Sequence, residues 1–177
     1  MSLKLDTTHS SIEFAVRHMG LATVKGRFHK FDVTAEVNEN GEPVSTKVVV
    51  DASSIDTGVA DRDNHLRSPD FFDVANHPQI VFEATSFRRE GDEYVVDGQL
   101  TMRGVTHPVT LRGEIAGPIK DPWGNERFAA DLQGKVDRTK WGLKWNQVLE
   151  AGGLLVAEEV RFHAVVELVK VGEPVAA

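Results

Sequence analysis

The stretch that decides the fold is Glu-Val-Arg-Phe-His-Ala-Val-Val-Glu-Leu, residues Glu159–Leu168. From Val160 onward every second residue is apolar or small, while the residues between them include Arg161, His163 and Glu167. Successive side chains of a β-strand point to opposite faces, so this alternation predicts a strand with one face on a core and the other in water.

The same alternation recurs along the chain and predicts eight strands, several of them long. Polar turns rich in glycine and proline separate them, as in Asn38–Pro43 and Asp121–Asn125. Short links favour antiparallel pairing of neighbours, and closing such a sheet into a barrel removes its exposed edges. The other seven predicted strands are Ser11–His18, Gly26–Val37, Lys47–Ile55, Gln79–Phe87, Val95–Arg103, Val105–Ile115 and Arg127–Val136.

Three segments depart from the alternation. The apolar phase shifts between Phe28 and Phe31, which predicts a β-bulge near His29-Lys30. Thr57–Ser68 predicts a short helical segment capped by Asp56 or Thr57, and Ser68-Pro69 a second helical start. Thr139–Ala157 is a long loop of the kind that often carries function. We therefore expect an all-β fold with one or two short helical segments, formed by a single domain over residues 1–171 with a disordered tail at 172–177.

Composition excludes several classes of function. The 177 residues carry a formal net charge of −7, which disfavours binding to nucleic acid. The chain has no cysteine, so thiolate chemistry and disulfides are absent. No apolar run is long enough to span a membrane as a helix. The N-terminus shows no secretory signal, which favours a cytoplasmic location, or a periplasmic one if a leader was removed.

Several residues on the predicted inward faces are small. Small side chains leave space along the axis of an eight-stranded barrel, which favours a long apolar cavity for a chain-like lipid. The alternative is a filled barrel in which small and large residues alternate to fit a taper. The small inward residues are Ala52, Ala84, Gly98, Gly113, Ala130, Gly134 and Ala164.

Polar candidates are fewer, and each has a structural alternative. His18 ends an inward apolar stripe, where it would contact a ligand head group or serve as a structural histidine at the rim. Asp61 and His65 share a helical face and suggest an acid–base pair, although local ion pairing explains them better. Trp141 and Trp145 would either cover one barrel end as a lid or pack their loop onto the barrel.

Basic side chains would bind an anionic head group if they converged at one mouth, or would face water if they did not. They are Arg17, Lys25, Arg27, Arg62, His65 and Arg67. The sequence has no nucleophile elbow, no phosphate loop, and no His-x-His or His-Glu-x-x-His spacing. We therefore expect no catalytic residues, no metal site and no cofactor, and predict that the protein is not an enzyme.

Segments distributed over nearly the whole chain resemble the YceI-like family of polyisoprenoid-binding, lipocalin-like proteins. Each piece is weak alone, but their order and spacing together are specific. The segments are Thr8–Phe14, Val16–Gly20, Val24–Phe28, Asp51–Thr57, Arg62–Asp73, His77–Phe82, Gly98–Thr106 and Asp137–Gly142.

The resemblance implies an extended eight-stranded antiparallel lipocalin-like β-barrel that binds, transports or stores a long-chain isoprenoid, as an isoprenoid quinone or a prenyl pyrophosphate. It also implies a homodimer. The alternatives are a fatty-acyl carrier and an enzyme acting on a prenyl lipid head group. For the head group we expect His18, Arg62 and Trp145. The expected contacts of the tail are Phe14, Val16, Phe28, Phe82, Leu100 and Phe162.

Overall fold

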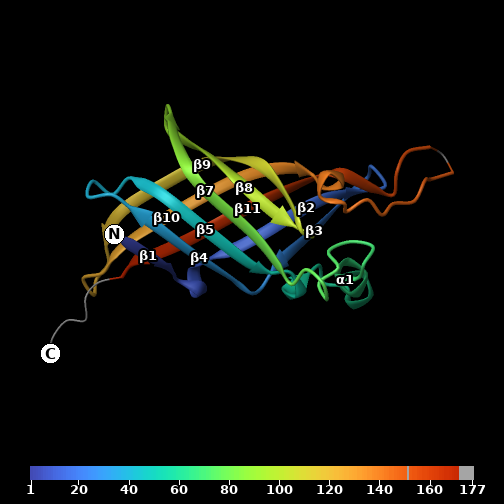
Figure 1. Cartoon of the computed structure of the whole chain (residues 1–177), viewed down its shortest axis with the longest axis horizontal. Coiled ribbons are helices and arrows are strands. Elements are labelled where there is room, and N and C mark those ends of the chain that lie inside the picture. The colour runs from blue at the N-terminus through green and yellow to red at the C-terminus, as the bar shows by residue number, and fades with distance from the viewer. Residues whose placement is uncertain (151, 172–177) are drawn as a thin grey trace.

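The computed structural model describes residues 1–150 and 152–171, and within them the chain forms an elongated β-barrel with one α-helix at one end (Figure 1). The predicted tail at 172–177 lies outside the described residues. No helix in the described part is both long and apolar enough to cross a membrane. The strands are β1 (Ser2–Leu5), β2 (Ser11–His18), β3 (Ala22–Phe28), β4 (Phe31–Val37), β5 (Pro43–Asp51), β6 (Ile55–Asp56), β7 (Gln79–Glu90), β8 (Glu93–Met102), β9 (Val105–Lys120), β10 (Glu126–Asp137) and β11 (Val156–Lys170).

The strands close into a barrel of eight long strands, which we call staves. β1 with β2, β3 with β4 and β5 with β6 each form one stave, and the other five strands form one each. β5, β7, β8, β9, β10 and β11 pair in sequence order as an antiparallel meander. β11 then pairs with β2 and also with β1, while β2 pairs with β3 and β1 with β4. Because β4 pairs with β5, no long stave lacks a neighbour. The eight-stranded barrel is confirmed.

Three of the eight staves are interrupted, which is why eleven strand segments make eight staves. The 3₁₀ helix η1 (Thr7–His9) separates β1 from β2, and η2 (Ala52–Ser54) separates β5 from β6. The third break lies at His29-Lys30, between β3 and β4, where the sequence predicts a bulge. The apolar phase shift is therefore real, but the strand breaks there and its two halves pair with different partners.

The turns follow the predicted chemistry, whereas some element boundaries do not. Arg103 and Gly104 both adopt positive φ, as a two-residue hairpin turn between β8 and β9 requires. β9 continues to Lys120, five residues past the predicted end. The prediction ended too early because the last part of the strand is exposed and its sequence does not alternate in polarity. Strands of this length span roughly 50 Å.

The helical segment is shorter than predicted and capped differently. The helix α1 (Ala60–Arg67) begins after Val59, which makes no side-chain cap. Asp56 and Thr57 were the wrong caps because both bond elsewhere: Asp56 accepts from the Gly58 amide, and Thr57 donates to Asp63. The second helical start at Ser68-Pro69 is a series of turns, and Ser68 instead ends α1.

Candidate functional site

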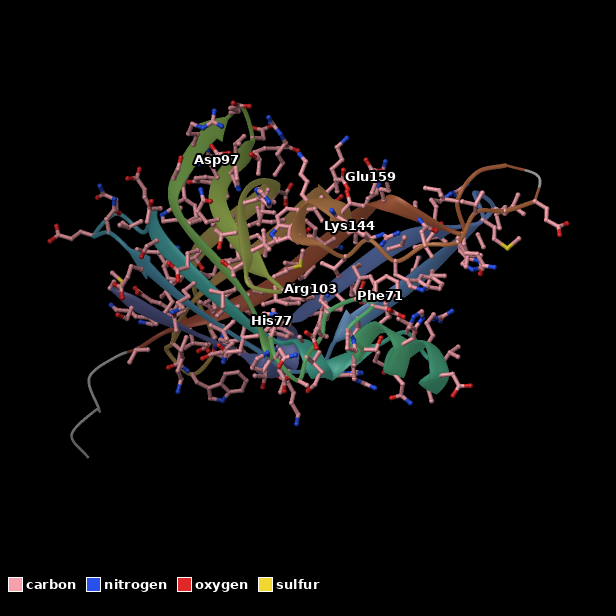
Figure 2. The ribbon with its side chains drawn as sticks, turned by 45° about the vertical axis from the view of Figure 1, so that its right-hand side comes forward. Phe71, His77, Asp97, Arg103, Lys144 and Glu159 are labelled. Carbon is pink, nitrogen blue, oxygen red and sulfur yellow. The ribbon has the colours of Figure 1, made fainter. Side chains whose placement is uncertain are left out.

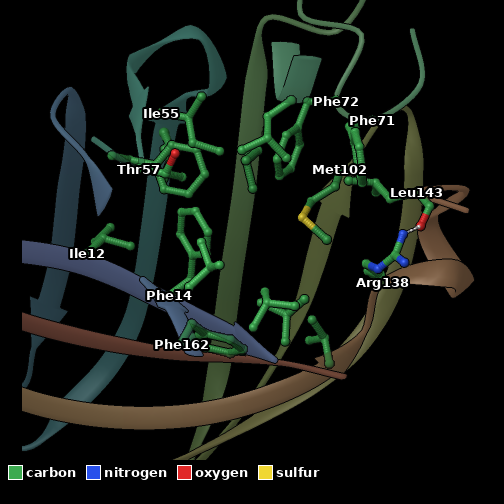
Figure 3. Close-up of a pocket in the computed structure, with 18 of the residues that line it drawn as sticks. Ile12, Phe14, Ile55, Thr57, Phe71, Phe72, Met102, Arg138, Leu143 and Phe162 are labelled. Carbon is green, nitrogen blue, oxygen red and sulfur yellow. Dashed lines mark hydrogen bonds between the residues drawn. The ribbon is translucent and has the colours of Figure 1, made fainter. Parts of the chain in front are cut away.

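A cavity of about 500 Å³ occupies the barrel interior on the side of α1. Each of the eight staves contributes inward side chains to it, and most of these side chains are aliphatic or aromatic (Figure 3). Its volume lies within the range of pockets that hold small organic ligands. The barrel is therefore hollow here, as predicted, although Ala164 is the only one of the seven small residues named from the sequence that lines this cavity.

All six residues predicted to contact an apolar tail line this cavity. Whether they contact a ligand stays a prediction, but their placement follows from strand parity as the alternation requires. Phe14 and Phe28 pack against each other with ring centroids 5.6 Å apart. The full set is Phe14, Val16, Phe28, Phe82, Leu100 and Phe162.

Three of these phenylalanines lie over glycines of the neighbouring strand. The ring of Phe162 occupies the space beside Gly134, so that a Cβ on that glycine would lie 2.6 Å from the ring. The same relation holds for Phe82 over Gly98 and for Phe14 over Gly26. A glycine in a strand permits such close approach of an aromatic side chain.

These phenylalanine–glycine pairs sharpen the explanation of the cavity. Gly98 and Gly134 do not simply leave empty space, because a phenyl ring fills the space that each one frees. Each ring is thereby accommodated against the barrel wall. The lumen keeps its width even though large aromatic residues line it.

Polar lining residues come from three segments at one end of the barrel, which we call the mouth. They are the end of β2, the helix α1 with Thr57 before it, and the start of the long loop after β10. Figure 1 shows α1, the tip of the β2–β3 hairpin and this loop at the same end. The polar lining residues are Arg17, His18, Thr57, Asp61, Arg62, His65 and Arg138. The cavity is thus apolar inside and polar at the mouth.

Arg138 holds the long loop after β10 in place through hydrogen bonds to its backbone. It directly follows β10 in the 3₁₀ helix η3 (Arg138–Trp141), and only 4% of it is exposed. Its guanidinium donates four hydrogen bonds to backbone carbonyls, including those of Leu143 at 2.5 Å and Ala157 at 2.9 Å (Figure 3). Burial lowers the pKa of Arg138 because it disfavours the charged form.

The charge of Arg138 has no carboxylate partner within 4 Å in the described residues. The carbonyl dipoles and the face of Phe71, 5.7 Å from its guanidinium carbon, are its electrostatic partners. The carboxylates of Glu158 and Asp137 attract the guanidinium only at longer range, and this attraction raises its pKa against the larger effect of burial. Arg138 therefore contributes positive potential at the mouth of a protein that is negative overall.

The two tryptophans of the long loop have different roles. Trp141 is only 2% exposed and its indole N–H donates to the Leu100 carbonyl at 2.9 Å, so it fixes the loop to the barrel. Trp145 lines the cavity and packs edge-on against His65 of α1, with centroids 4.6 Å apart. Packing of the loop onto the barrel, one of the two alternatives from the sequence, is thus confirmed for Trp141, whereas a lid formed by Trp145 stays a prediction.

The other two residues predicted at a head group also line the mouth. His18 ends the inward stripe of β2, as its parity predicts. Arg62 donates to both the hydroxyl and the carbonyl of Thr57, while that hydroxyl donates to buried Asp63. This network holds the start of α1 against the barrel.

Of the other polar residues considered from the sequence, some line the cavity and some do not. His65 contacts Asp70 at 2.9 Å, so the acid–base pair with Asp61 does not form and local ion pairing explains the cluster. Arg17 reaches the rim and donates to the Gly20 carbonyl. Lys25, Arg27 and Arg67 do not line the cavity.

Sequence reasoning missed several lining residues. Phe71, Phe72 and Leu143 lie in turns and loops, where no periodicity indicates which side chains point inward. Arg138 was missed because a charged residue directly after a strand is expected to lie in an exposed turn. Its only signal was its place in the segment Asp137–Gly142, one of those that resemble the family.

Comparison with known proteins agrees with this geometry. A YceI-like domain profile matches residues 3–168. Protein YceI of Escherichia coli is 38% identical over 138 residues, which are 77% of this chain and 72% of that protein. Protein YceI of Salmonella arizonae is 40% identical over 129 residues, 72% of this chain and 68% of that protein.

Solved structures share the fold at low sequence identity. BcnA of Burkholderia cenocepacia superposes with a TM-score of 0.78 at 20% identity, covering 92% of this chain and 98% of that one. A polyisoprenoid binding domain from Saccharophagus degradans gives a TM-score of 0.69 at 15% identity, covering 96% and 98%. The profile match and the curated relatives together show that this chain belongs to the YceI-like family.

Proposed function

We propose that this protein binds a long-chain amphiphilic lipid, most specifically a polyisoprenoid, and carries or stores it with its tail inside the barrel. The observation that carries the proposal is the interior cavity of about 500 Å³, which is apolar along the barrel and polar only at its mouth. An amphiphile has the same distribution, with an apolar chain and one polar end. Burying that chain supplies most of the affinity.

The charges at the mouth support a head group that is anionic or rich in hydrogen-bond acceptors. Arg17, Arg62 and Arg138 line the cavity, and Asp61 is the one carboxylate that lines it in the described part of the chain. A net positive mouth on a protein of net charge −7 favours a pyrophosphate or a quinone carbonyl. A fatty carboxylate satisfies the same groups, so a fatty-acyl ligand is the second candidate.

The polyisoprenoid binding domain of Saccharophagus degradans, which shares the fold, supports an isoprenoid tail. Catalysis is not part of the proposal. The histidines of the lining are His18 and His65, and the latter is paired with Asp70 instead of with a carboxylate of the lining. The homodimer and the cytoplasmic location stay predictions.

Native mass spectrometry of the gently purified protein tests the proposal. We expect a bound species heavier than the chain, which releases a lipid on denaturation. Ala164→Phe narrows the lumen and should abolish the heavier species, whereas Val165→Phe, which changes the next residue of the same strand, should keep it. A wild-type protein that carries no lipid and takes up none from mixed vesicles would contradict the proposal.

A further inference from the structure

The barrel interior holds a second cavity beyond the first. Its volume is about 110 Å³, and it lies toward the end of the barrel formed by β1, the β4–β5 turn and the β9–β10 turn. Its own lining is apolar and includes Leu3, Val37 and Phe128. The interior therefore holds a larger cavity behind the mouth and a smaller one toward the far end.

Five side chains line both cavities and so form the partition between them. They come from β2, β5, β7, β9 and β11, which are distributed around the whole ring. Two direct cross-strand pairs belong to the set, Ile12 with Ala164 and Val48 with Phe82. We call these five residues the girdle: Ile12, Val48, Phe82, Leu111 and Ala164.

Phe82 contributes the largest side chain of the girdle and is 8% exposed. Its ring lies over Gly98 of β8, where a Cβ would be 2.5 Å from the ring. Leu111 approaches Gly134 of β10 in the same way, at 2.9 Å from a Cβ placed there. β8 and β10, which add no side chain to the girdle, thus each supply a glycine that gives space to a girdle side chain of the neighbouring strand.

We propose that Phe82 sets the length of the tail that this protein accepts, an inference that rests on the proposed function. A tail that enters at the mouth fills the larger cavity and meets the girdle before the smaller one. Additional carbon atoms must displace packed side chains to pass, and overpacking a well-packed interior is unfavourable. Affinity should rise with tail length only until the larger cavity is filled.

Competitive displacement of a fluorescent fatty-chain probe by geraniol, farnesol and geranylgeraniol, which increase by one isoprene unit, tests this inference. For the wild type we expect affinity to rise and then level off within the series. Phe82→Ala joins the two cavities, so the longest alcohol should bind about tenfold more tightly than to the wild type, because each further buried methylene raises affinity about fourfold.

Phe87→Ala is the matched control, since Phe87 lines the smaller cavity only and its loss leaves both the larger cavity and the girdle intact, so the length preference should stay unchanged. Leu111→Ala opens the girdle from another strand and decides the matter if Phe82→Ala does not fold. Affinity that levels off at the same alcohol in every folded girdle variant would overturn the inference, as would wild-type affinity that rises through the whole series. A wild type that binds neither probe nor alcohol would refute the proposed function instead.

Discussion

Two arginines at opposite ends of β10 have opposite surroundings. Arg127, at its start, contacts three carboxylates, with Asp6 and Asp121 each at 2.8 Å and Glu167 at 3.2 Å. The hydrogen bonds that Arg127 donates to Asp121 and, to a lesser extent, to Asp6 raise the pKa of Arg127. Arg138, directly after β10, has only backbone carbonyls as hydrogen-bond partners, and burial lowers its pKa.

The two ends of the barrel thus differ in how charge is neutralised and in how much interior space they hold. At the Arg127 end, charge is neutralised locally, and a small apolar cluster with Leu3, Val33 and Phe128 surrounds the smaller cavity of about 110 Å³. At the Arg138 end, charge is held without a counterion beside a wide cavity (Figure 2 shows the side chains around this end, with Phe71, Arg103 and Lys144 labelled). On the proposed function, an anionic head group bound at the mouth would supply countercharge to Arg138.

We expect the largest effect, a loss of folding stability, from Arg138→Ala. It leaves several buried carbonyls without donors, and each such group costs free energy. We expect the free energy of unfolding to fall by about 3 kcal/mol in urea denaturation. Arg161→Ala, at an exposed arginine of β11, should change it little. Equal stability of the two variants would show that Arg138 does not hold the loop.

Gly134→Val should reduce binding strongly while lowering stability less. The new side chain collides with the ring of Phe162 and forces it from its place, at a cost of about 1–3 kcal/mol. We expect probe affinity to fall about tenfold or more, since the lumen narrows. Gly134→Val combined with Phe162→Ala should restore binding; if the double variant binds no better than Gly134→Val, the phenylalanine–glycine pair does not set the lumen width.

Arg127→Leu should affect stability and leave binding unchanged. Three carboxylates lose their common partner and repel one another, so we expect the thermal midpoint to fall by a few degrees in calorimetry. Affinity for the probe should stay within about twofold of the wild type. A loss of binding as large as that caused by Gly134→Val would mean that the two ends are not independent.

The smallest expected effect is a pH dependence of the free energy of unfolding, which arises from Asp6 and His9 near Arg127. Hydrogen bonds to Thr8, His9 and Arg127 lower the pKa of Asp6, so its contribution to stability is present above the ordinary aspartate value and lost as pH falls through the lowered one. Asp6 in turn raises the pKa of His9, whose contribution is present below the ordinary histidine value and lost as pH rises through the raised one. Asp6→Asn should flatten both slopes in thermal unfolding curves taken across pH; unchanged slopes would exclude Asp6 as their source.

The sequence predicted the staves because half-buried strands must alternate in polarity. It placed Phe14, Phe82 and His18 correctly on the inward face for the same reason. The length of β9 was underestimated, since its exposed last part has no apolar alternation. Alternation reports contact with a core, and beyond the core it disappears although the hydrogen bonds continue.

The features that depend on three-dimensional pairing were not visible in the sequence. Gly134 faces Phe162 only because β10 and β11 pair in one particular register. Arg138 finds its acceptors only after the chain from Leu143 to Ala157 returns over it. The girdle likewise needs the closed ring, which brings Ile12 to the same level as Leu111.

The proposed binding mode places a lipid tail inside the barrel and its head group at the mouth. Paramagnetic broadening in NMR spectra tests it directly, with stearic acid carrying a nitroxide either near its carboxylate or near its methyl end. We expect the first label to broaden signals of Trp145 and His18, and the second to broaden methyl signals of Val48 and Leu111. If both labels broaden only outward-facing residues, or if the two patterns are reversed, the account is wrong.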